Sequence, residues 1–231
     1  MYLSRVQVAT EGLDRGALLN LLAGDAYSNH QLLWKMFQSA QDRPFLFRQE
    51  TEREQLSLTD TTRSLPLFYV LSSQIPEPVP GLLKADCKSF QPALEPGQRL
   101  IFRLRANPTV ARKRANGERS GRHDVLMDAK TQCKALGGDS PGTIEEKMHR
   151  AASTWLEERA AKGGFKLDFT PQVTGYRQHY LKRKGSDIRF SSVDFEGALT
   201  VSDPARFIET LFTGLGRSKA FGCGLMMVRR G

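Results

Sequence analysis

The sequence predicts an α+β protein with two ferredoxin-like (RRM-like) domains in tandem and a glycine-rich loop near its C-terminus. Each half of the chain opens with a similar strand pattern, YLSRVQV in the first half and RLIFRLRANPT in the second. Helical and strand patterns follow in both halves, although the sequence contains no exact repeat. The turn Glu95–Gln98 separates the halves, so we expect domains at residues 1–94 and 95–231.

In the first half, residues 2–8 form the opening strand, and the leucine spacing of Asp14–Ala23 is helical with Asp14 as the N-cap. HQLLWKMF predicts a short amphipathic helix that ends before Pro44. PFLFRQE and LPLFYVLS have the composition of strands. The proline-rich stretch SSQIPEPVPGLLKAD predicts a loop, and CKSFQPAL a last strand.

In the second half, the hydrophilic stretch VARKRANGERSGRHD is too polar to pack and predicts a mobile basic loop. A helix follows over Thr143–Lys162, because Thr143 and Glu146 form a capping box and Gly163–Gly164 can end it.

The remainder of the second half predicts a hairpin, a helix and a strand. Residues 171–201 alternate through two strands with a turn near Lys184–Ser186. Asp203 and Pro204 open a helix that reaches Phe212. The glycine-rich loop and the strand GLMMV complete the chain.

Composition points to a polyanionic partner. Lys and Arg outnumber Asp and Glu by 34 to 25, which gives a formal charge of +9. Nucleic acid is favoured over a membrane surface, because the chain has no basic amphipathic helix or lipidation motif; a merely basic protein is the alternative. We expect a cytoplasmic protein, because the chain has neither a signal-peptide pattern nor an apolar run of membrane length. Cys87, Cys133 and Cys223 are odd in number and far apart, which indicates a reducing compartment without disulfides.

The glycine-rich loop GLGRSKAFGCGL is the first candidate site. It lies between a helix and a strand, so it is not a dinucleotide-binding fingerprint, and it lacks a Walker ending. Glycines such as Gly216 and Gly222 let backbone N–H groups approach a phosphate, and Arg217 and Lys219 can add charge-assisted contacts. The alternative is a tight structural turn.

Tyr27 and His30 form the second candidate site. Three residues apart at the start of a helix, their side chains lie on one face and can reach the same ligand. An imidazole exchanges protons near neutrality, and for a phosphodiester beside a 2′-hydroxyl it needs no metal. The alternative is a surface histidine beside a packing tyrosine.

Other chemistry finds little support in the sequence. No spacing of His, Asp or Glu resembles a metal site, no cofactor motif is present, and there is no G-x-S-x-G nucleophile. The other three histidines are expected to be solvated or to face RNA: His123, His149 and His179.

The hairpin YRQHYLKRKGSDIRF is the third candidate, because cations gather along its arms and tip with Tyr176 and Tyr180 between them. A narrow basic ribbon can enter a groove of duplex nucleic acid, and A-form RNA is recognised mainly by shape and backbone. The alternative is a solvated hairpin. The cations are Arg177, Lys182, Arg183, Lys184 and Arg189.

The segments MYLSRVQV, DAYSNHQLLWKMF, RPFLFRQE, LIFRLRANPT and above all GLGRSKAFGCGL resemble the CasE family, the CRISPR RNA-processing endoribonucleases of the type I-E Cascade complex. The resemblance covers nearly the whole chain and implies two ferredoxin-like domains. It also implies metal-independent cleavage of precursor CRISPR RNA at the base of the repeat stem-loop. The products are then mature crRNA with a 2′,3′-cyclic phosphate and a 5′-hydroxyl, and the other Cascade subunits are expected partners.

The resemblance also assigns residues. His30 matches the family's catalytic histidine and Tyr27 its companion tyrosine, while Lys35 fits a supporting cationic position five residues from His30. We expect His30 to transfer a proton, most simply to the 5′-oxygen, and Tyr27 to orient the 2′-hydroxyl or the phosphate. The RNA-binding candidates by motif match are Arg217, Ser218 and Lys219.

Two non-enzymatic functions stay open. A non-catalytic RNA-binding subunit with tandem RRM-like folds would carry exposed aromatic residues on an RNP-like strand, and FLFRQE matches that pattern poorly. A purely structural Cascade subunit would not need Tyr27 and His30.

Overall fold

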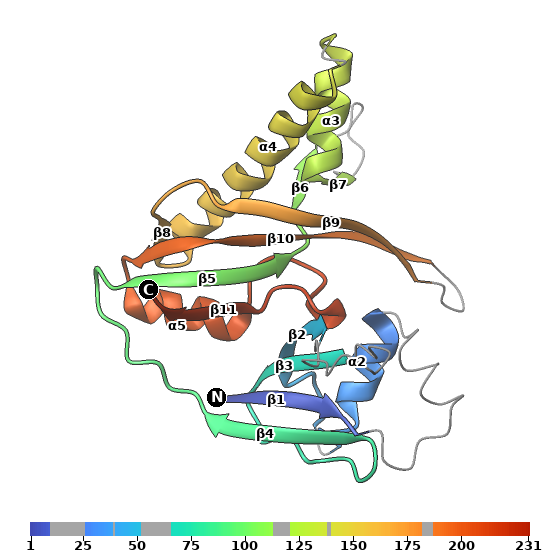
Figure 1. Cartoon of the computed structure of the whole chain (residues 1–231), viewed down its shortest axis with the longest axis vertical. Helices are drawn as coiled ribbons and strands as arrows, with labels where there is room; N and C mark the ends of the chain where they lie inside the picture. The colour runs from blue at the N-terminus through green and yellow to red at the C-terminus, as the bar shows by residue number, and fades with distance from the viewer. Residues whose placement is uncertain (10–25, 39, 52–65, 113–120, 138–139, 182–186) are drawn as a thin grey trace, which may run out of the picture. The chain divides into compact units, whose positions relative to one another are not determined.

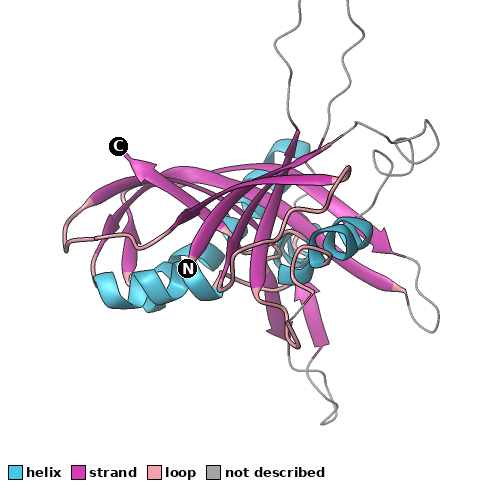
Figure 2. Cartoon of the chain, turned by 90° about the horizontal axis from the view of Figure 1, so that it is seen from below, coloured by secondary structure: helices cyan, strands magenta, loops and turns pink. Residues whose placement is uncertain are grey.

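The computed structural model describes residues 1–9, 26–38, 40–51, 66–112, 121–137, 140–181 and 187–231 (Figure 1). These residues form two compact units that both combine strands with helices (Figure 2). The first unit contains Met1–Pro92 and Lys219–Gly222, and the second contains Ala93–Ser218 and Cys223–Gly231. No helix of the described residues is long and apolar enough to cross a membrane.

The first unit is built on a four-stranded antiparallel sheet in the order β2-β3-β1-β4. This is the strand order of a ferredoxin-like sheet, in which the first strand lies between the third and the fourth. The connection of residues 73–82, between β3 and β4, contains no helix. The elements are β1 (Tyr2–Val8), α2 (Ala26–Trp34), β2 (Phe45–Thr51), β3 (Pro66–Ser72) and β4 (Leu83–Ser89).

The core of the first unit lies between α2 and the sheet. Leu33 and Met36, from α2 and the turn after it, are fully buried against aromatic side chains of β2 and β3. Stacked rings of Phe37 and Phe45, 4.9 Å between centroids, fix the end of this helical segment to the first residue of β2. The core therefore fixes the position of α2 on the sheet.

The second unit repeats this strand order with larger insertions. Its sheet runs β11-β5-β10-β8, with β9 also paired to β10. A two-stranded ribbon of β6 and β7 and the helix α3 are inserted between β5 and α4. The strands are β5 (Arg99–Ala106), β6 (Thr109–Arg112), β7 (Gly121–Asp124), β8 (Phe165–Leu167), β9 (Gln172–Leu181), β10 (Ile188–Val201) and β11 (Met226–Arg230). The helices are α3 (Val125–Ala135), α4 (Pro141–Lys162) and α5 (Pro204–Thr213).

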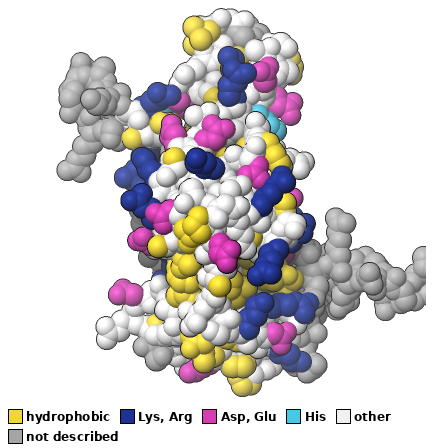
Figure 3. All heavy atoms as spheres, turned by 90° about the vertical axis from the view of Figure 1, so that its left-hand side faces the viewer, with side chains coloured by type: hydrophobic (Ala, Val, Ile, Leu, Met, Phe, Trp, Pro, Cys, Tyr) yellow, Lys and Arg dark blue, Asp and Glu magenta, His cyan; other side chains and the backbone are white. Residues whose placement is uncertain are grey.

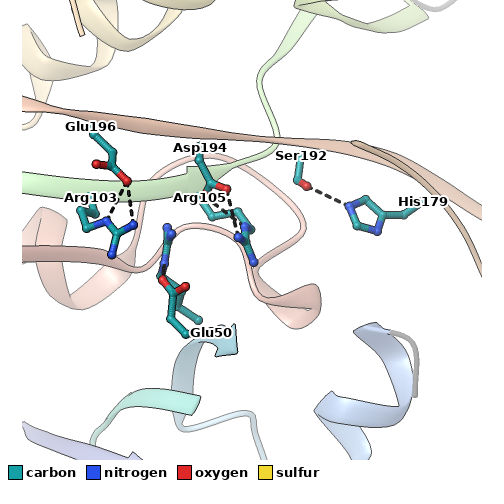
Figure 4. Close-up of polar contacts among 8 residues, drawn as sticks. Glu50, Arg103, Arg105, His179, Ser192, Asp194 and Glu196 are labelled. Atoms are coloured by element: carbon teal, nitrogen blue, oxygen red, sulfur yellow. Dashed lines mark hydrogen bonds and ion pairs between the residues drawn. The ribbon is translucent and has the colours of Figure 1, made fainter. Parts of the chain in front are cut away.

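Strand β5 separates the core of the second unit from a charged outer face. Leu100, Phe102 and Leu104 point inward and are buried. On the opposite face, Arg103 pairs with Glu196 and Arg105 with Asp194, each directly across β5 and β10 (Figure 4). These cations are therefore neutralised within the protein.

Several sequence predictions need correction. The stretch of residues 110–124 is not simply a loop, because its ends form the β6–β7 ribbon and Asp124 caps α3, a helix that the sequence analysis missed. Thr143 does not cap α4, which begins at Pro141 after Ser140, because proline is well suited to the first helical position.

The last strand of the first unit is also displaced. Strand β4 starts at Leu83, inside the predicted proline-rich loop, because pairing with β1 begins there. The short strand β8 was not predicted. Asp203 caps α5 through its hydrogen bond from the Arg206 amide, as expected. The helix predicted at Asp14–Ala23 and the turn at Lys184–Ser186 lie outside the described residues.

Candidate nucleic-acid interface and active site

His30 occupies a largely apolar corner of the first unit. Its ring lies 5.8 Å from that of Trp34, 5.7 Å from that of Phe45 and 6.5 Å from that of Phe47, measured between centroids. Its Nε2 atom is buried and has no hydrogen-bond partner among the described residues. Tyr27, one turn earlier on α2, has 37% of its surface exposed. Both side chains therefore lie on one helix, as predicted, with Nε2 of His30 buried and Tyr27 accessible.

Burial lowers the pKa of the His30 imidazole below its ordinary value, and the nearby positive charge of Arg43 lowers it further. Arg43 directly precedes Pro44 and strand β2 and is itself half-buried, which lowers its pKa as well. In the free protein the neutral imidazole is therefore the favoured form at pH 7.

A side-chain hydrogen bond connects α2 to the sheet. Buried Asn29 donates a hydrogen bond to Oε1 of Gln49 on β2, at 2.8 Å.

Lys35 lies one residue beyond the end of α2 and is exposed, and its backbone N–H donates to the carbonyl oxygen of Leu32. Lys35 thus does not continue the helical face that carries His30.

The glycine-rich loop has its backbone in the left-handed region at alternate positions. Gly214, Gly216, Gly222 and Gly224 all have positive φ, and so does Ser218, at 56°. A Cβ added to Gly216 would lie 3.1 Å from Cη2 of Trp155, and one added to Gly222 would lie 3.2 Å from Cε2 of Phe47. The need for glycine at both positions is therefore explained by packing and φ, as the structural-turn alternative requires. RNA binding by their backbones stays a prediction.

The cations between these glycines have different surroundings. Arg217 is exposed and pairs by its backbone with Asn107, whose side-chain amide donates to Oγ of Ser218 at 2.6 Å. Lys219 starts the short 3₁₀ helix η2 (Lys219–Phe221), which belongs to the first unit. Burial, and then the charge of Arg43, lower the pKa of Lys219.

The arms of the basic hairpin form one wall of a hollow of about 380 Å³ in the second unit. Tyr180 is 64% exposed there, and the guanidinium of Arg189 lies over its ring at 5.4 Å. The hollow is also lined by Arg122 of β7 and by Arg217. Arg177 of β9 is exposed, while the predicted hairpin cations Lys182, Arg183 and Lys184 lie outside the described residues.

His179, which the sequence left open as solvated or RNA-facing, is tied into the protein. Its ring stacks on Phe190 at 4.4 Å between centroids, and its Nε2 shares a 2.8 Å hydrogen bond with Oγ of Ser192 (Figure 4). Burial and the charges of Arg105 and Arg177 lower its pKa. His123 on β7 and His149 on α4 are exposed.

Charges of both signs are interspersed over the face shown in Figure 3, so the basic side chains there do not form one uniform patch. Among the described residues, no three His, Cys, Asp or Glu side chains are grouped as metal ligands would be.

A family described as CRISPR associated protein matches residues 1–230 of the chain. The chain belongs to this family. It is 38% identical over 152 residues to the CRISPR-associated endoribonuclease Cse3 of Thermus thermophilus, an alignment that covers 61% of this chain and 60% of Cse3. It is 26% identical over 230 residues to the CRISPR system Cascade subunit CasE of Escherichia coli, with 98% of both chains covered.

A solved structure of CRISPR endoribonuclease Cse3 bound to a 19 nt RNA is also similar to this CRISPR-associated protein. It has a TM-score of 0.69 and 28% identity, over 99% of this chain and 100% of that one. The predicted membership of the CasE family and the tandem ferredoxin-like α+β fold are confirmed by these comparisons.

Sequence reasoning missed two features of the site in this CRISPR-associated protein. Arg43 is the first residue of the segment RPFLFRQE, but a single arginine before a strand does not by itself indicate a chemical role. The packing of Lys219–Gly222 in the first unit has no local signal either, because these residues lie far along the chain from His30.

Proposed function

We propose that this protein is a metal-independent endoribonuclease that cleaves precursor CRISPR RNA at the base of the repeat stem-loop. Its partners are then the repeat RNA, before and after cleavage, and the other subunits of a Cascade complex. The relatives named Cse3 and CasE, together with the similarity to an RNA-bound Cse3, support an RNA-cleaving member of this family.

The observation that carries the proposal is the surroundings of His30. Its Nε2 has no hydrogen-bond partner in the part of the chain that the structure describes, and the positive charge of Arg43 acts on this imidazole and on Lys219. An imidazole beside cations is suited to a phosphodiester, because the cations attract the phosphate and the imidazole exchanges a proton.

The reaction needs one proton removed and one supplied. The 2′-oxygen attacks the adjacent phosphorus and loses its proton as the P–O2′ bond forms. The P–O5′ bond breaks, and the leaving 5′-oxygen takes up a proton. The products are a 2′,3′-cyclic phosphate and a 5′-hydroxyl, and no oxidant or other reactant is needed.

The lowered pKa of His30 bears on whether this residue acts as the base or the acid of the reaction. Neutral imidazole accepts a proton, so the free protein is prepared to receive the 2′-hydroxyl proton. The role of acid toward the 5′-oxygen requires that the bound phosphate raise the pKa again, which an adjacent negative charge does. Tyr27, exposed on the same helix, can orient the 2′-hydroxyl or the phosphate.

The test is incubation of the protein with a labelled repeat hairpin in excess EDTA, followed by analysis of the RNA ends. A 2′,3′-cyclic phosphate and a 5′-hydroxyl are expected. An intact hairpin that stays tightly bound would instead show a non-catalytic RNA-binding subunit, while a 3′-hydroxyl with a 5′-phosphate would exclude 2′-hydroxyl attack.

We expect His30→Ala to lower the single-turnover cleavage rate by about 10²–10⁴-fold, the usual contribution of general acid–base catalysis. Hairpin affinity should change little, and Tyr27→Phe should be milder because it keeps the ring. His149→Ala, which removes an exposed histidine of α4, is the matched control. A His30→Ala protein that keeps more than about a tenth of the wild-type rate would remove His30 from the mechanism.

A further inference from the structure

Three segments that are separated in sequence meet around one ring in the first unit. The ring of Phe47 on β2 lies nearly parallel to that of His30 on α2, at an interplanar angle of 20°. The same ring lies against Gly222, at the end of the Lys219–Gly222 segment. Within the first unit, Phe47 therefore lies against both His30 and the end of the Lys219–Gly222 segment.

Arg43 enters this corner two residues before Phe45, whose ring also contacts His30. Arg43, in the connection before β2, differs from the partly or fully buried arginines of the strands. Arg48 pairs with Glu50, and Arg105 with Asp194. Among the residues that the structure describes, no carboxylate lies within 4.0 Å of the Arg43 guanidinium. A half-buried guanidinium without an acidic partner is costly unless an anion binds there.

Two further basic groups feel the charge of Arg43. Besides their own burial, its positive charge disfavours the charged forms of His30 and of Lys219. Two basic side chains, Arg43 and Lys219, thus lie close enough to interact electrostatically in the unit that holds His30, whose Nε2 has no hydrogen-bond partner among the described residues. Such a group favours a bound anion over a neutral ligand.

We propose that Arg43 binds the scissile phosphate of the RNA together with Lys219 and holds it beside Nε2 of His30. This proposal rests on the proposed function, because the phosphate is that of the cleaved linkage. Arg43 is then a substrate-binding residue of the reaction that the sequence motifs do not assign. Its guanidinium is well suited to the task, since it can donate two parallel hydrogen bonds to phosphate oxygens.

The first experiment compares Arg43→Gln and Arg43→Lys with Lys88→Gln. Lys88 is an exposed cation of β4, at the opposite edge of the same sheet, so its variant controls for the loss of one charge. Arg43→Gln should cleave about 10²-fold more slowly in single turnover, the size of a lost transition-state donor, and Arg43→Lys should recover part of the rate. On a hairpin with a 2′-deoxy nucleotide at the cleavage position, Arg43→Gln and Lys219→Ala should each lower the log–log salt slope by roughly 0.7–0.9, whereas Lys88→Gln should not.

The second experiment does not depend on cleavage. Inorganic phosphate is titrated into the RNA-free protein, and the pKa of His30 is followed by NMR. Phosphate should raise this pKa in the wild-type protein and in Lys88→Gln, and raise it less in Arg43→Gln. The same NMR spectra show whether each variant is folded.

Two results would overturn the proposal. One is that Arg43→Gln cleaves within twofold of the wild-type rate. The other is that phosphate raises the pKa of His30 equally in the wild-type protein and in Arg43→Gln. If the wild-type protein fails to cleave repeat RNA, the proposed function fails. The phosphate titration still decides in that case whether Arg43 and His30 share an anion.

Discussion

Replacing Gly222 by alanine tests why the loop contains glycine. The alanine must adopt φ +80°, and its Cβ would lie 3.2 Å from Cε2 of Phe47, which is closer than an ordinary van der Waals contact. The left-handed backbone costs an L-residue about 1–2 kcal/mol, and overpacking against the ring about 1–3 kcal/mol. The stiffer unfolded chain returns about 0.4–1 kcal/mol. We therefore expect a loss of about 3 kcal/mol in the free energy of unfolding.

Two other glycines separate these contributions. Gly97 has φ +82° with nothing within 4 Å of an added Cβ, so Gly97→Ala measures backbone strain alone. At Gly197 no positive φ arises, but the Cβ would lie 3.2 Å from Cε1 of Phe102, so Gly197→Ala measures packing alone. Each should lose about 1 kcal/mol, less than Gly222→Ala.

The assay is urea unfolding followed by tryptophan fluorescence, since Trp34 reports on the first unit and Trp155 on the second. With the usual dependence on urea, a 3 kcal/mol loss moves the midpoint of the first unit by about 1–3 M. The reasoning is refuted if Gly222→Ala is no less stable than Gly97→Ala. Unchanged stability with a large loss of RNA affinity would indicate that the loop contacts RNA at this glycine.

Two further predictions concern titration and capping. The pKa values of His30 and His179 in the folded protein lie below their ordinary value, so the unfolded chain binds more protons. The free energy of unfolding should therefore fall as pH decreases through about 6.5, and it should fall less in His30→Gln. Urea titrations between pH 5 and 8 measure this change. Asp124 accepts hydrogen bonds from the backbone of Leu126 and Met127 and from the Tyr176 hydroxyl, so Asp124→Ala should lower the free energy of unfolding by about 2 kcal/mol, measured with urea. Asp203 caps α5 through one hydrogen bond, from the Arg206 amide, so Asp203→Ala should cost about 1 kcal/mol. Equal losses would show that the Tyr176 bond contributes nothing.

Features that depend on neighbouring residues could be predicted from the sequence. Strand β1 spans residues 2–8 as expected, and Asp203 caps α5, because alternation and capping are properties of a few consecutive residues. Tyr27 and His30 share α2 for the same reason. The capping box at Thr143 failed because Ser140 and Pro141 offered an equally local alternative start.

The site shows the limit of that reasoning. Short stretches of sequence were enough to predict that a histidine and a tyrosine lie on one helix and that a glycine-rich loop carries cations. The packing of Lys219–Gly222 in the first unit, and the action of Arg43 on both His30 and Lys219, follow from the three-dimensional fold alone. Nearly 190 residues separate His30 from the Lys219–Gly222 segment. Both pack against Phe47, and packing between such distant segments leaves no periodic pattern in the sequence.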